Sequence, residues 1–221
     1  MKKYKAIGVM SGTSLDGLDI AYAEFCFDGN NWTFNFGNYI EIPYSKEWQT
    51  KLSNLIQTSA LEFVKTHVNF GHYMGEKVDA FIKKNKLDVD VIGVHGHTVF
   101  HQPELGFTSQ IGDGSAVASR TGKLVANDFR TMDVARGGQG APLVPIGDAL
   151  LFSDYMARIN LGGFSNISFG GLDDIRAFDI CPVNIVMNEI TRKQGLAYDE
   201  EGKIARSGRV NYKLLDKLNQ L

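Results

Sequence analysis

Hydrophobic and polar positions near the start of the chain predict a β-hairpin. Residues 6–10 form an apolar run typical of a buried strand, and residues 18–22 alternate apolar and polar side chains as a second strand does. Gly12 and Gly17 permit the positive φ angles of a tight turn between the two runs. The tip of this hairpin carries hydroxyl and carboxylate side chains, those of Ser11, Thr13, Ser14, Asp16 and Asp19.

The next segments alternate between strand and helix patterns. Alternating aromatic and polar residues over 32–42 predict a third antiparallel strand, and apolar residues spaced three and four apart predict a helix over about 47–86. Residues 89–94 form a short apolar run suited to a parallel strand buried on both faces. Asp113 is a suitable N-cap for a helix over 116–120. Further short elements are expected as strands over 108–112 and 124–126 and as a helix over 148–155.

The hairpin pattern recurs in the last third of the chain. Residues 157–169 again show a strand, a glycine-rich polar tip and a strand. A strand over 175–178, a helix over 185–193 and a basic amphipathic tail are expected after it. This mixture of strands and helices predicts an α/β fold. If the two hairpins faced each other across a cleft, they could hold the phosphates of a nucleotide from both sides.

Composition and charge narrow the class of protein. The 221 residues are 43% hydrophobic and 22% charged, as in a globular protein with a substantial core, built as one large domain or two small ones. The net charge of −2 and the scattered Lys and Arg residues give no electrostatic case for binding nucleic acid or an anionic membrane. Only Cys26 and Cys181 are present, and neither a signal-peptide core nor a membrane-spanning run is found, so a cytoplasmic protein with free thiols is expected.

The tip of the first hairpin has the chemistry of a phosphate-binding loop. Its backbone N–H groups and hydroxyls can contact phosphate oxygens. Asp16 or Asp19 can hold Mg²⁺ directly or through water, because that ion prefers oxygen ligands. An ordinary polar turn is the alternative, since Gly, Ser and Asp are also the commonest turn residues.

Histidines follow the buried strand predicted over residues 89–94. Ligands of open α/β sheets gather beyond the carboxyl ends of strands, so His95 and its neighbours are candidates for a cleft. His95 and His97 lie two apart and would project to the same side of an extended chain. Together with His101 they could bind a metal such as zinc, as in a metal-dependent hydrolase. A purely structural role is the alternative.

Two further polar groups lie close to predicted strands. Arg130 follows the strand over 124–126, and its guanidinium can form a bidentate contact with a ligand carboxylate or pair with Asp128 or Asp133. Asp179 lies at the end of the strand over 175–178 and before a helix, where a carboxylate can act as a general base. Both are therefore candidates for the chemistry of a site.

Several motifs resemble one family closely. Residues 8–17 (Gly-Val-Met-Ser-Gly-Thr-Ser-Leu-Asp-Gly), 128–130 (Asp-Phe-Arg) and 137–143 (Gly-Gly-Gln-Gly-Ala-Pro-Leu) are similar to signatures of the anhydro-N-acetylmuramic acid kinases, members of the actin, Hsp70 and sugar-kinase superfamily. The resemblance implies a two-lobed ribonuclease H-like ATPase fold with an incomplete second lobe, because these kinases continue well past residue 221. It places the first lobe at residues 1–152 and the start of the second at 153–221.

The resemblance also implies a role for individual residues. Asp179 would be the catalytic base, and Asp16 and Asp19 would bind Mg²⁺. Four positions depart from the family pattern: His97 stands where Gln is usual, and Ile180, Cys181 and Val183 replace a Thr and two Gly. The residues implied for ATP are Gly12, Thr13, Ser14, Leu15, Asp16, Gly17, Leu18, Asp19, Gly162, Gly163 and Asn166, and those implied for the sugar are His95, Thr98, Asp128, Arg130 and Asn184.

The reaction implied by the resemblance joins hydrolysis to phosphorylation. Asp179 would take a proton from water, the water would open the anhydro bridge of 1,6-anhydro-N-acetylmuramic acid, and O6 would accept the γ-phosphoryl group of ATP. The product would be N-acetylmuramic acid 6-phosphate, an intermediate of cell-wall recycling, and the protein would form a homodimer. The alternatives are a kinase of the same fold for another sugar or acid, the metal-dependent hydrolase, and a non-catalytic sugar-binding fragment.

Overall fold

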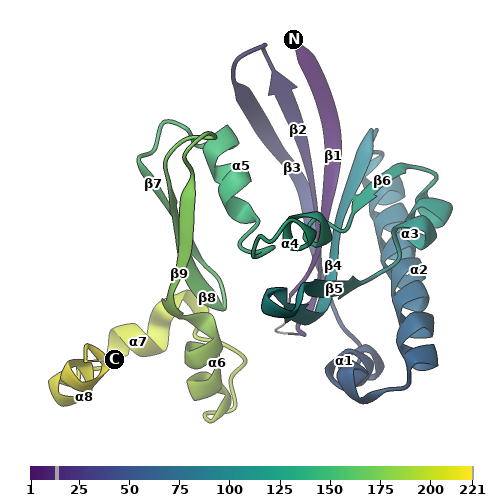
Figure 1. Ribbon diagram of the computed structural model, residues 1–221. Helices are drawn as coiled ribbons and strands as arrows, with labels where there is room; N and C mark the ends of the chain where they lie inside the picture. The colour runs from purple at the N-terminus through teal and green to yellow at the C-terminus, as the bar shows by residue number, and fades with distance from the viewer. Residues whose placement is uncertain (13–14, 221) are drawn as a thin grey trace. The chain divides into compact units, whose positions relative to one another are not determined.

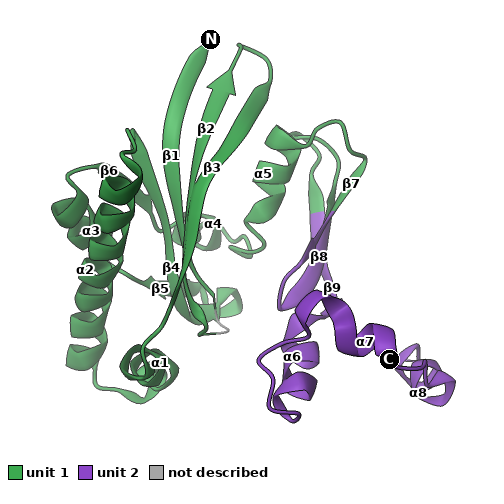
Figure 2. Ribbon diagram, turned by 180° about the vertical axis from the view of Figure 1, so that it is seen from behind, with its two compact units in different colours: residues 1–158, 168–176 green, residues 159–167, 177–221 purple. Residues whose placement is uncertain are grey.

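The computed structural model describes residues 1–12 and 15–220 (Figure 1). Thr13 and Ser14, both implied in phosphate binding, lie outside the described residues. The chain divides into two compact units (Figure 2): unit 1 comprises residues 1–158 and 168–176, and unit 2 comprises residues 159–167 and 177–221.

The main sheet of unit 1 confirms the expected α/β fold. Its strand order is β3-β2-β1-β4-β5, with β6 also paired to β4. The first three strands are antiparallel, and β4 runs parallel to both β1 and β6, which is the arrangement of a ribonuclease H-like sheet. The strands are β1 (Lys2–Ser11), β2 (Gly17–Phe27), β3 (Trp32–Pro43), β4 (Val91–Gln102), β5 (Phe107–Ile111) and β6 (Leu124–Asn127).

The centre of this sheet is the buried strand expected near residue 90. Residues 91–94 pair with β1 on one edge and with β6 on the other, and Ile92 and Val94 are at most 1% exposed. The expectation that the strand ends at residue 94 is wrong, because β4 continues to Gln102 and pairs antiparallel with β5. Gly96 allows this continuation: its φ is +75°, and a Cβ there would lie 2.4 Å from the Ile111 carbonyl oxygen. His95 and His97 therefore lie within a strand.

The single helix predicted over 47–86 is also wrong. The segment forms α1 (Lys46–Ser53), a short 3₁₀ turn η1 (Leu55–Gln57) and α2 (Ala60–Asn85). A serine begins each α-helix, since Ser45 Oγ accepts a hydrogen bond from the Trp48 amide and Ser59 Oγ accepts one from the Glu62 amide. The apolar stripe continues across the break, but the two caps divide the helix.

Helix α2 covers the sheet together with α3 (Gly114–Thr121), and the two helices lie side by side (Figures 1 and 2). The inner face of α2 buries Phe70, Met74 and Val78 completely, in the same core cluster as Ile7 and Leu18 of the sheet. Gly71 and Gly75 on α2 permit the close approach of α3, since a Cβ at either position would lie under 3 Å from atoms of α3 or its cap.

The Gly71→Ala substitution is expected to lower the free energy of unfolding by about 1–3 kcal/mol. Its new Cβ would lie 2.5 Å from the carbonyl oxygen and 2.8 Å from the amide nitrogen of Asp113, so α2 and the start of α3 must separate. The gain in helix propensity, about 1 kcal/mol, offsets only part of this cost. Urea unfolding followed by circular dichroism measures the change. Ala80→Gly, at an exposed position of the same helix, measures the difference in helix propensity between Ala and Gly without a steric clash. A Gly71→Ala chain that is more stable than the unsubstituted chain would contradict the expectation.

Unit 2 contains most of a smaller sheet with the order β7-β8-β9. The hairpin predicted over 157–169 is confirmed as β7 (Ala157–Leu161) and β8 (Phe164–Phe169). Strand β9 (Arg176–Pro182) is longer than expected, so Asp179 lies inside a strand and not at its end.

The helix expected over 148–155 begins earlier, as α5 (Val144–Leu151) with a proline in its first turn. The other elements are η2 (Pro103–Leu105), α4 (Thr131–Ala135), α6 (Asn184–Arg192), η3 (Glu200–Gly202), α7 (Lys203–Ser207) and α8 (Tyr212–Leu218).

Over residues 1–12 and 15–220, every helix is too short or too polar to cross a bilayer.

Candidate functional site

The end of β1 is joined to β4 by a buried chain of hydrogen bonds. A register shift in the β1–β4 pairing places His97 opposite Ser11, the last residue of β1. Ser11 Oγ lies 3.2 Å from His97 Nδ1 and accepts a hydrogen bond of 2.7 Å from the Tyr44 hydroxyl. The three residues are at most 5% exposed. Burial raises the pKa of Tyr44 and lowers that of His97, while a hydrogen bond to the Gly12 backbone acts in the opposite direction on His97.

A second cluster in unit 1 joins β4 to the segment after β6. Arg130 Nε and Nη2 lie 3.0 and 2.8 Å from His95 Nε2, and Arg130 Nη1 donates to the Gly140 carbonyl at 2.7 Å. Burial lowers the pKa of His95, the Gly96 carbonyl raises it, and the adjacent guanidinium lowers it. An arginine is always a donor, so His95 is a neutral imidazole whose Nε2 accepts from Arg130.

The carboxylates of Asp128 and Asp133, near Arg130, accept hydrogen bonds from backbone amides. Asp133 Oδ2 accepts from the Gly140 amide at 2.7 Å, and Asp128 Oδ1 accepts from the Thr131 amide at 3.3 Å. Asp128 has a positive φ of 58°, so the chain turns sharply just before the arginine. Asp133 thus fixes the loop at Gly140, and the Gly140 carbonyl in turn holds Arg130. The implied sugar residues His95 and Arg130 are in direct contact, and Thr98 lies three residues after His95, half-buried, on β4.

Stability is expected to fall as the pH drops from 7.5 to 5.5, because burial lowers the pKa of both His95 and His97 below the usual 6.5. Well above pH 6.5 both histidines are neutral in the folded and in the unfolded chain, so their full contribution to stability is present. Below it the unfolded chain takes up protons first, and the loss is at most about 1.4 kcal/mol per pH unit for His97. Urea midpoints across this range measure the effect. A His95→Gln/His97→Gln chain should show a flatter dependence, and an equally steep one would contradict the assignment.

The described part of the first predicted phosphate loop is fixed at both ends. Leu15 adopts a positive φ of 57°, and its amide lies 3.4 Å from the Gly12 carbonyl oxygen. Asp16 Oδ1 accepts from the Gly17 amide at 2.9 Å, and the Asp16 carbonyl accepts from the Tyr44 amide at 3.1 Å. Gly17 is required because a Cβ there would lie 2.6 Å from the Ile42 carbonyl oxygen of β3. The described residues between β1 and β2 are therefore held by backbone hydrogen bonds and by close contact with β3.

The carboxylates of this loop suit a hard divalent cation. Burial, then the nearby Glu41 and Asp16, raise the pKa of Asp19, which shows that negative charge accumulates here. Asp19 pairs with Glu41 across β2 and β3. Mg²⁺ is commonly held by one or two carboxylates together with substrate phosphates, so Asp16 and Asp19 fit that ion. Leu18 is completely buried and serves the core of the sheet.

The second predicted phosphate loop in unit 2 is tied to the start of α6. The Val183 and Ile185 amides donate to the Gly163 carbonyl at 2.8 and 3.3 Å, and the Asn184 amide donates to the Gly162 carbonyl at 3.2 Å. The loop carbonyls therefore satisfy the free donors of a helix N-terminus. Added Cβ atoms at Gly162 and Gly163 would meet only the Phe164 oxygen at 3.5 Å, so this tip is open.

The remaining implied residues of unit 2 lie close to this loop along the chain. Asn184 Nδ2 lies 3.4 Å from the Leu161 carbonyl oxygen, which ties the implied sugar residue to the end of β7. Asn166 is half-buried on β8, and Asp179 is exposed on β9. The unit thus contains an open glycine tip and an accessible carboxylate, both built on strands.

The metal-site hypothesis for the three histidines is not supported. His97 contacts Ser11, His95 contacts Arg130, and His101 Nδ1 lies 3.1 Å from Thr108 Oγ1. No group of three or more His, Cys, Asp or Glu side chains is placed to hold a metal within residues 1–12 and 15–220. The bulge at Gly96 breaks the simple alternation on which the hypothesis depended.

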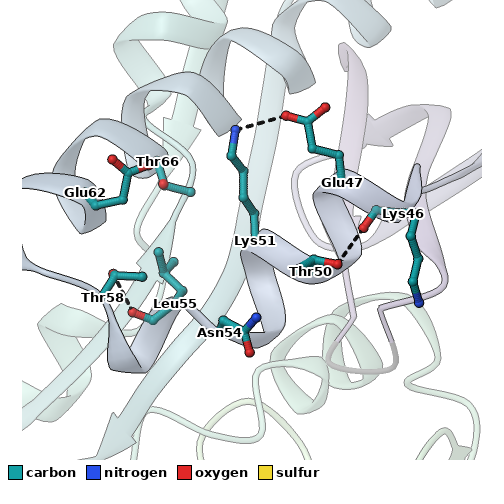
Figure 3. Close-up of a pocket in the computed structure, with 9 residues that line it drawn as sticks. All are labelled: Lys46, Glu47, Thr50, Lys51, Asn54, Leu55, Thr58, Glu62 and Thr66. Carbon is teal, nitrogen blue, oxygen red and sulfur yellow. Dashed lines mark hydrogen bonds and ion pairs between the residues drawn. The ribbon is translucent and has the colours of Figure 1, made fainter.

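A surface groove lies apart from the predicted site residues. A groove of about 460 Å³ is formed by α1, η1 and α2. Figure 3 shows its lining residues, among them the Lys51–Glu47 ion pair. Its lining residues lie between Lys46 and Thr66 and include none of the residues implied for ATP or sugar.

Sequence reasoning missed three residues that build these clusters. Tyr44, Asp133 and Gly140 support Ser11 and Arg130 through contacts that depend on the fold. A weak signal for Tyr44 was its place directly after the third strand, where an aromatic residue can turn inward. Asp133 was considered only as a partner for Arg130, and its actual role, holding the glycine loop, needed the structure.

Comparisons with known proteins agree with the motifs. A sequence model of the anhydro-N-acetylmuramic acid kinase family matches residues 4–220. The anhydro-N-acetylmuramic acid kinase of Zymomonas mobilis is 39% identical, covering 96% of this chain and 63% of its own length, and that of Haemophilus influenzae is 38% identical, covering 99% and 59%. The solved structure of the ethanolamine utilization protein EutJ from Carboxydothermus hydrogenoformans is 12% identical, with a TM-score of 0.37 over 92% of this chain and 61% of that one.

The curated relatives are longer than this chain. It spans about 60% of their length, from 59% to 63% for the two kinases named above. The family match begins at Tyr4 and ends at Gln220, so it covers nearly the whole of this chain. The chain therefore belongs to the anhydro-N-acetylmuramic acid kinase family.

Proposed function

We propose that the chain serves an ATP-dependent kinase that opens 1,6-anhydro-N-acetylmuramic acid hydrolytically and phosphorylates its O6. The observation that carries this proposal is the Arg130 cluster, in which the guanidinium is held by His95 and Gly140 within hydrogen-bond distance. A muramic acid derivative carries a lactyl carboxylate, and a fixed guanidinium is the side chain best suited to bind it. Family membership supports the same substrate class.

Arg130 would bind the lactyl carboxylate of the sugar. Its guanidinium has five N–H donors, and its contacts with His95 and Gly140 use three of them, which leaves two for a carboxylate. The ring nitrogen of His95 contacts Nε and Nη2, so it fixes the plane of the guanidinium. Burial already lowers the pKa of Arg130, so a carboxylate would relieve the cost of a partly buried positive charge.

The loop residues would hold the phosphates of ATP. Asp16 and Asp19 would bind Mg²⁺, which neutralises phosphate charge when it is bound. In unit 2, the open tip at Gly162 and Gly163 leaves room for a phosphate oxygen to approach the backbone. Phosphoryl transfer needs positioning and charge neutralisation more than covalent help, and these are the properties of such loops.

Asp179 would act as the general base. It takes a proton from water as the water oxygen bonds to the anomeric carbon, and the bond between that carbon and O6 breaks. The freed O6 then attacks the γ-phosphorus of ATP, and the bond to ADP breaks. The products are N-acetylmuramic acid 6-phosphate and ADP. The exposed carboxylate of Asp179 on β9 is accessible for this role.

The test is a direct assay of phosphate transfer. The chain is incubated with Mg²⁺, ATP and 1,6-anhydro-N-acetylmuramic acid, and mass spectrometry follows ADP and the sugar 6-phosphate. Glucose, glycerol and acetate are the comparison acceptors. Transfer to the anhydro sugar above all others is expected, and a preference for another acceptor would show a kinase with a different substrate. The cytoplasmic location and the homodimer stay predictions, and fractionation and sedimentation would examine them.

A further inference from the structure

Tyr44 contacts both ends of the first phosphate loop, which runs from Gly12 to Asp16. Its hydroxyl donates to Ser11 Oγ at 2.7 Å, immediately before the loop, and its amide donates to the Asp16 carbonyl at 3.1 Å, at the end of the loop. The tyrosine ring is packed against Phe70 in the core, with ring centroids 6.1 Å apart. One residue, fixed by the core, therefore sets the separation between the two ends of the loop.

His97 contacts the start of the loop from the neighbouring strand. Its Nδ1 lies 3.2 Å from Ser11 Oγ, and the ring also forms a hydrogen bond with the backbone of Gly12. Because Ser11 Oγ accepts the hydrogen of Tyr44, it can donate its own hydrogen to His97 Nδ1. The neutral ring then carries its hydrogen on Nε2. The chain of donors thus runs from Tyr44 through Ser11 to His97.

Burial makes this chain of hydrogen bonds sensitive to any break. Ser11 is 1% exposed, and His97 and Tyr44 are each 5% exposed. Across residues 1–12 and 15–220, the buried side-chain nitrogen and oxygen atoms all have hydrogen-bond partners. A buried polar group that loses its partner carries a desolvation cost, and the chain can reduce that cost if Ser11 and Gly12 move until the group meets water. The positions of Ser11 and Gly12 therefore depend on these hydrogen bonds.

We propose that His97 is a positioning residue that holds the start of the phosphate loop in the conformation that binds ATP. The inference rests on the proposed function. His97 acts through Ser11 and Gly12 and does not itself contact the phosphates. It lies two residues after His95, which contacts Arg130, so one strand positions both the nucleotide loop and the sugar residue.

The first test measures the loop itself. His97→Leu removes both ring nitrogens, whereas His97→Gln keeps a hydrogen-bond acceptor and a donor. His97→Gln therefore keeps the test decisive if His97→Leu fails to fold. Hydrogen exchange followed by NMR compares the amides of Gly12, Leu15 and Gly17 with those of Ile20 on β2. In His97→Leu the loop amides should exchange at least tenfold faster and Ile20 should change less than twofold, while His97→Gln should restore most of the protection.

A matched control lies on the same strand. His101 also pairs with a hydroxyl through Nδ1, at 3.1 Å from Thr108 Oγ1, but it is remote from the loop in the β4 register. His101→Gln should leave loop exchange unchanged. Equal acceleration of the loop and of Ile20 in His97→Leu would mean that His97 serves only the general stability of unit 1. Unchanged loop exchange would also overturn the proposal.

The second test measures nucleotide binding. The dissociation constant of a non-hydrolysable ATP analogue with Mg²⁺ should rise about tenfold in His97→Leu and less than twofold in His97→Gln and His101→Gln. In the phosphate-transfer assay, the KM for ATP should rise more than kcat falls. If the unsubstituted chain binds no nucleotide, the proposed function fails, while hydrogen exchange still decides whether His97 positions the loop.

A double-substitution cycle tests whether the residues act as one chain. Ser11→Ala interrupts the same hydrogen bonds at the middle. If the chain is a unit, Ser11→Ala/His97→Leu should accelerate loop exchange no more than the larger single substitution does. If the accelerations of loop exchange in the two single variants multiply in the double variant, the two contacts are independent. That result would overturn the linked mechanism.

Discussion

An Asp179→Asn chain is expected to lose about 10²- to 10⁴-fold in kcat for phosphate transfer to the anhydro sugar, the usual range for removal of a general base. Asparagine has nearly the same size as aspartate but cannot take up the proton of the attacking water. Asp179 is exposed on β9, so the substitution removes the base without disturbing a buried core. The KM values for ATP and sugar should change little, because binding does not depend on the proton transfer.

Two further variants make this result specific. Asp173→Asn removes an exposed carboxylate from the turn before β9 and should leave kcat unchanged. Asp179→Glu keeps the base but displaces it by one methylene, so an intermediate loss is expected. Equal kcat values for Asp179→Asn and the unsubstituted chain would remove Asp179 from the mechanism.

Replacement of Arg130 by alanine is expected to lower kcat/KM for the anhydro sugar by roughly 10- to 150-fold, the equivalent of the 1.5–3 kcal/mol of a hydrogen bond to a charged group. The loss should lie mainly in the KM for the sugar, because the guanidinium binds the lactyl carboxylate and takes no part in bond breaking. His95 and the Gly140 carbonyl hold Arg130 in place, so the site has little freedom to recover the contact with another side chain. Steady-state kinetics with varied sugar concentration measures the effect.

The substrate itself supplies the sharpest control for Arg130. The matching anhydro sugar without a lactyl group should bind weakly to the unsubstituted chain and should be insensitive to Arg130→Ala. Arg130→Lys keeps the charge but loses the planar fork and should recover only part of the activity. Arg136→Ala removes an exposed arginine at the end of α4 and should have no effect. Equal losses for both sugars would show that Arg130 serves the fold and not the carboxylate.

Local sequence patterns predicted the elements whose apolar and polar positions form a simple, regular pattern. Residues 91–94 form a continuous apolar run in which Ile92 and Val94 are buried and Val91 and Gly93 are half-buried, and the first hairpin alternates because one face of it packs on the core. The hairpin over 157–169 was readable from its glycine-rich tip between two strand-like runs. His95 and Arg130 were found because polar residues interrupt apolar segments at these positions, and the structure brings the two into contact.

Patterns were less informative where distant segments meet. The break between α1 and α2 had a local signal, Ser59 followed three residues later by Glu62, but the apolar stripe concealed it. The partners of His97 had none, because Ser11 is 86 residues away along the chain. The bulge at Gly96 sets which histidine faces which partner, and it depends on the approach of Ile111 from β5. Such contacts are properties of the assembled sheet.

The long interval between β1 and β4 also affects how the chain is made. The pairing of β1 with β4 joins residues 85 positions apart, such as Ala6 and Val91, so β1, β2 and β3 leave the ribosome and pair with one another well before β4 is synthesised. During that time one edge of β1 is unpaired and can take up a strand from another molecule. A translation product that stops before β4 is therefore an aggregation hazard.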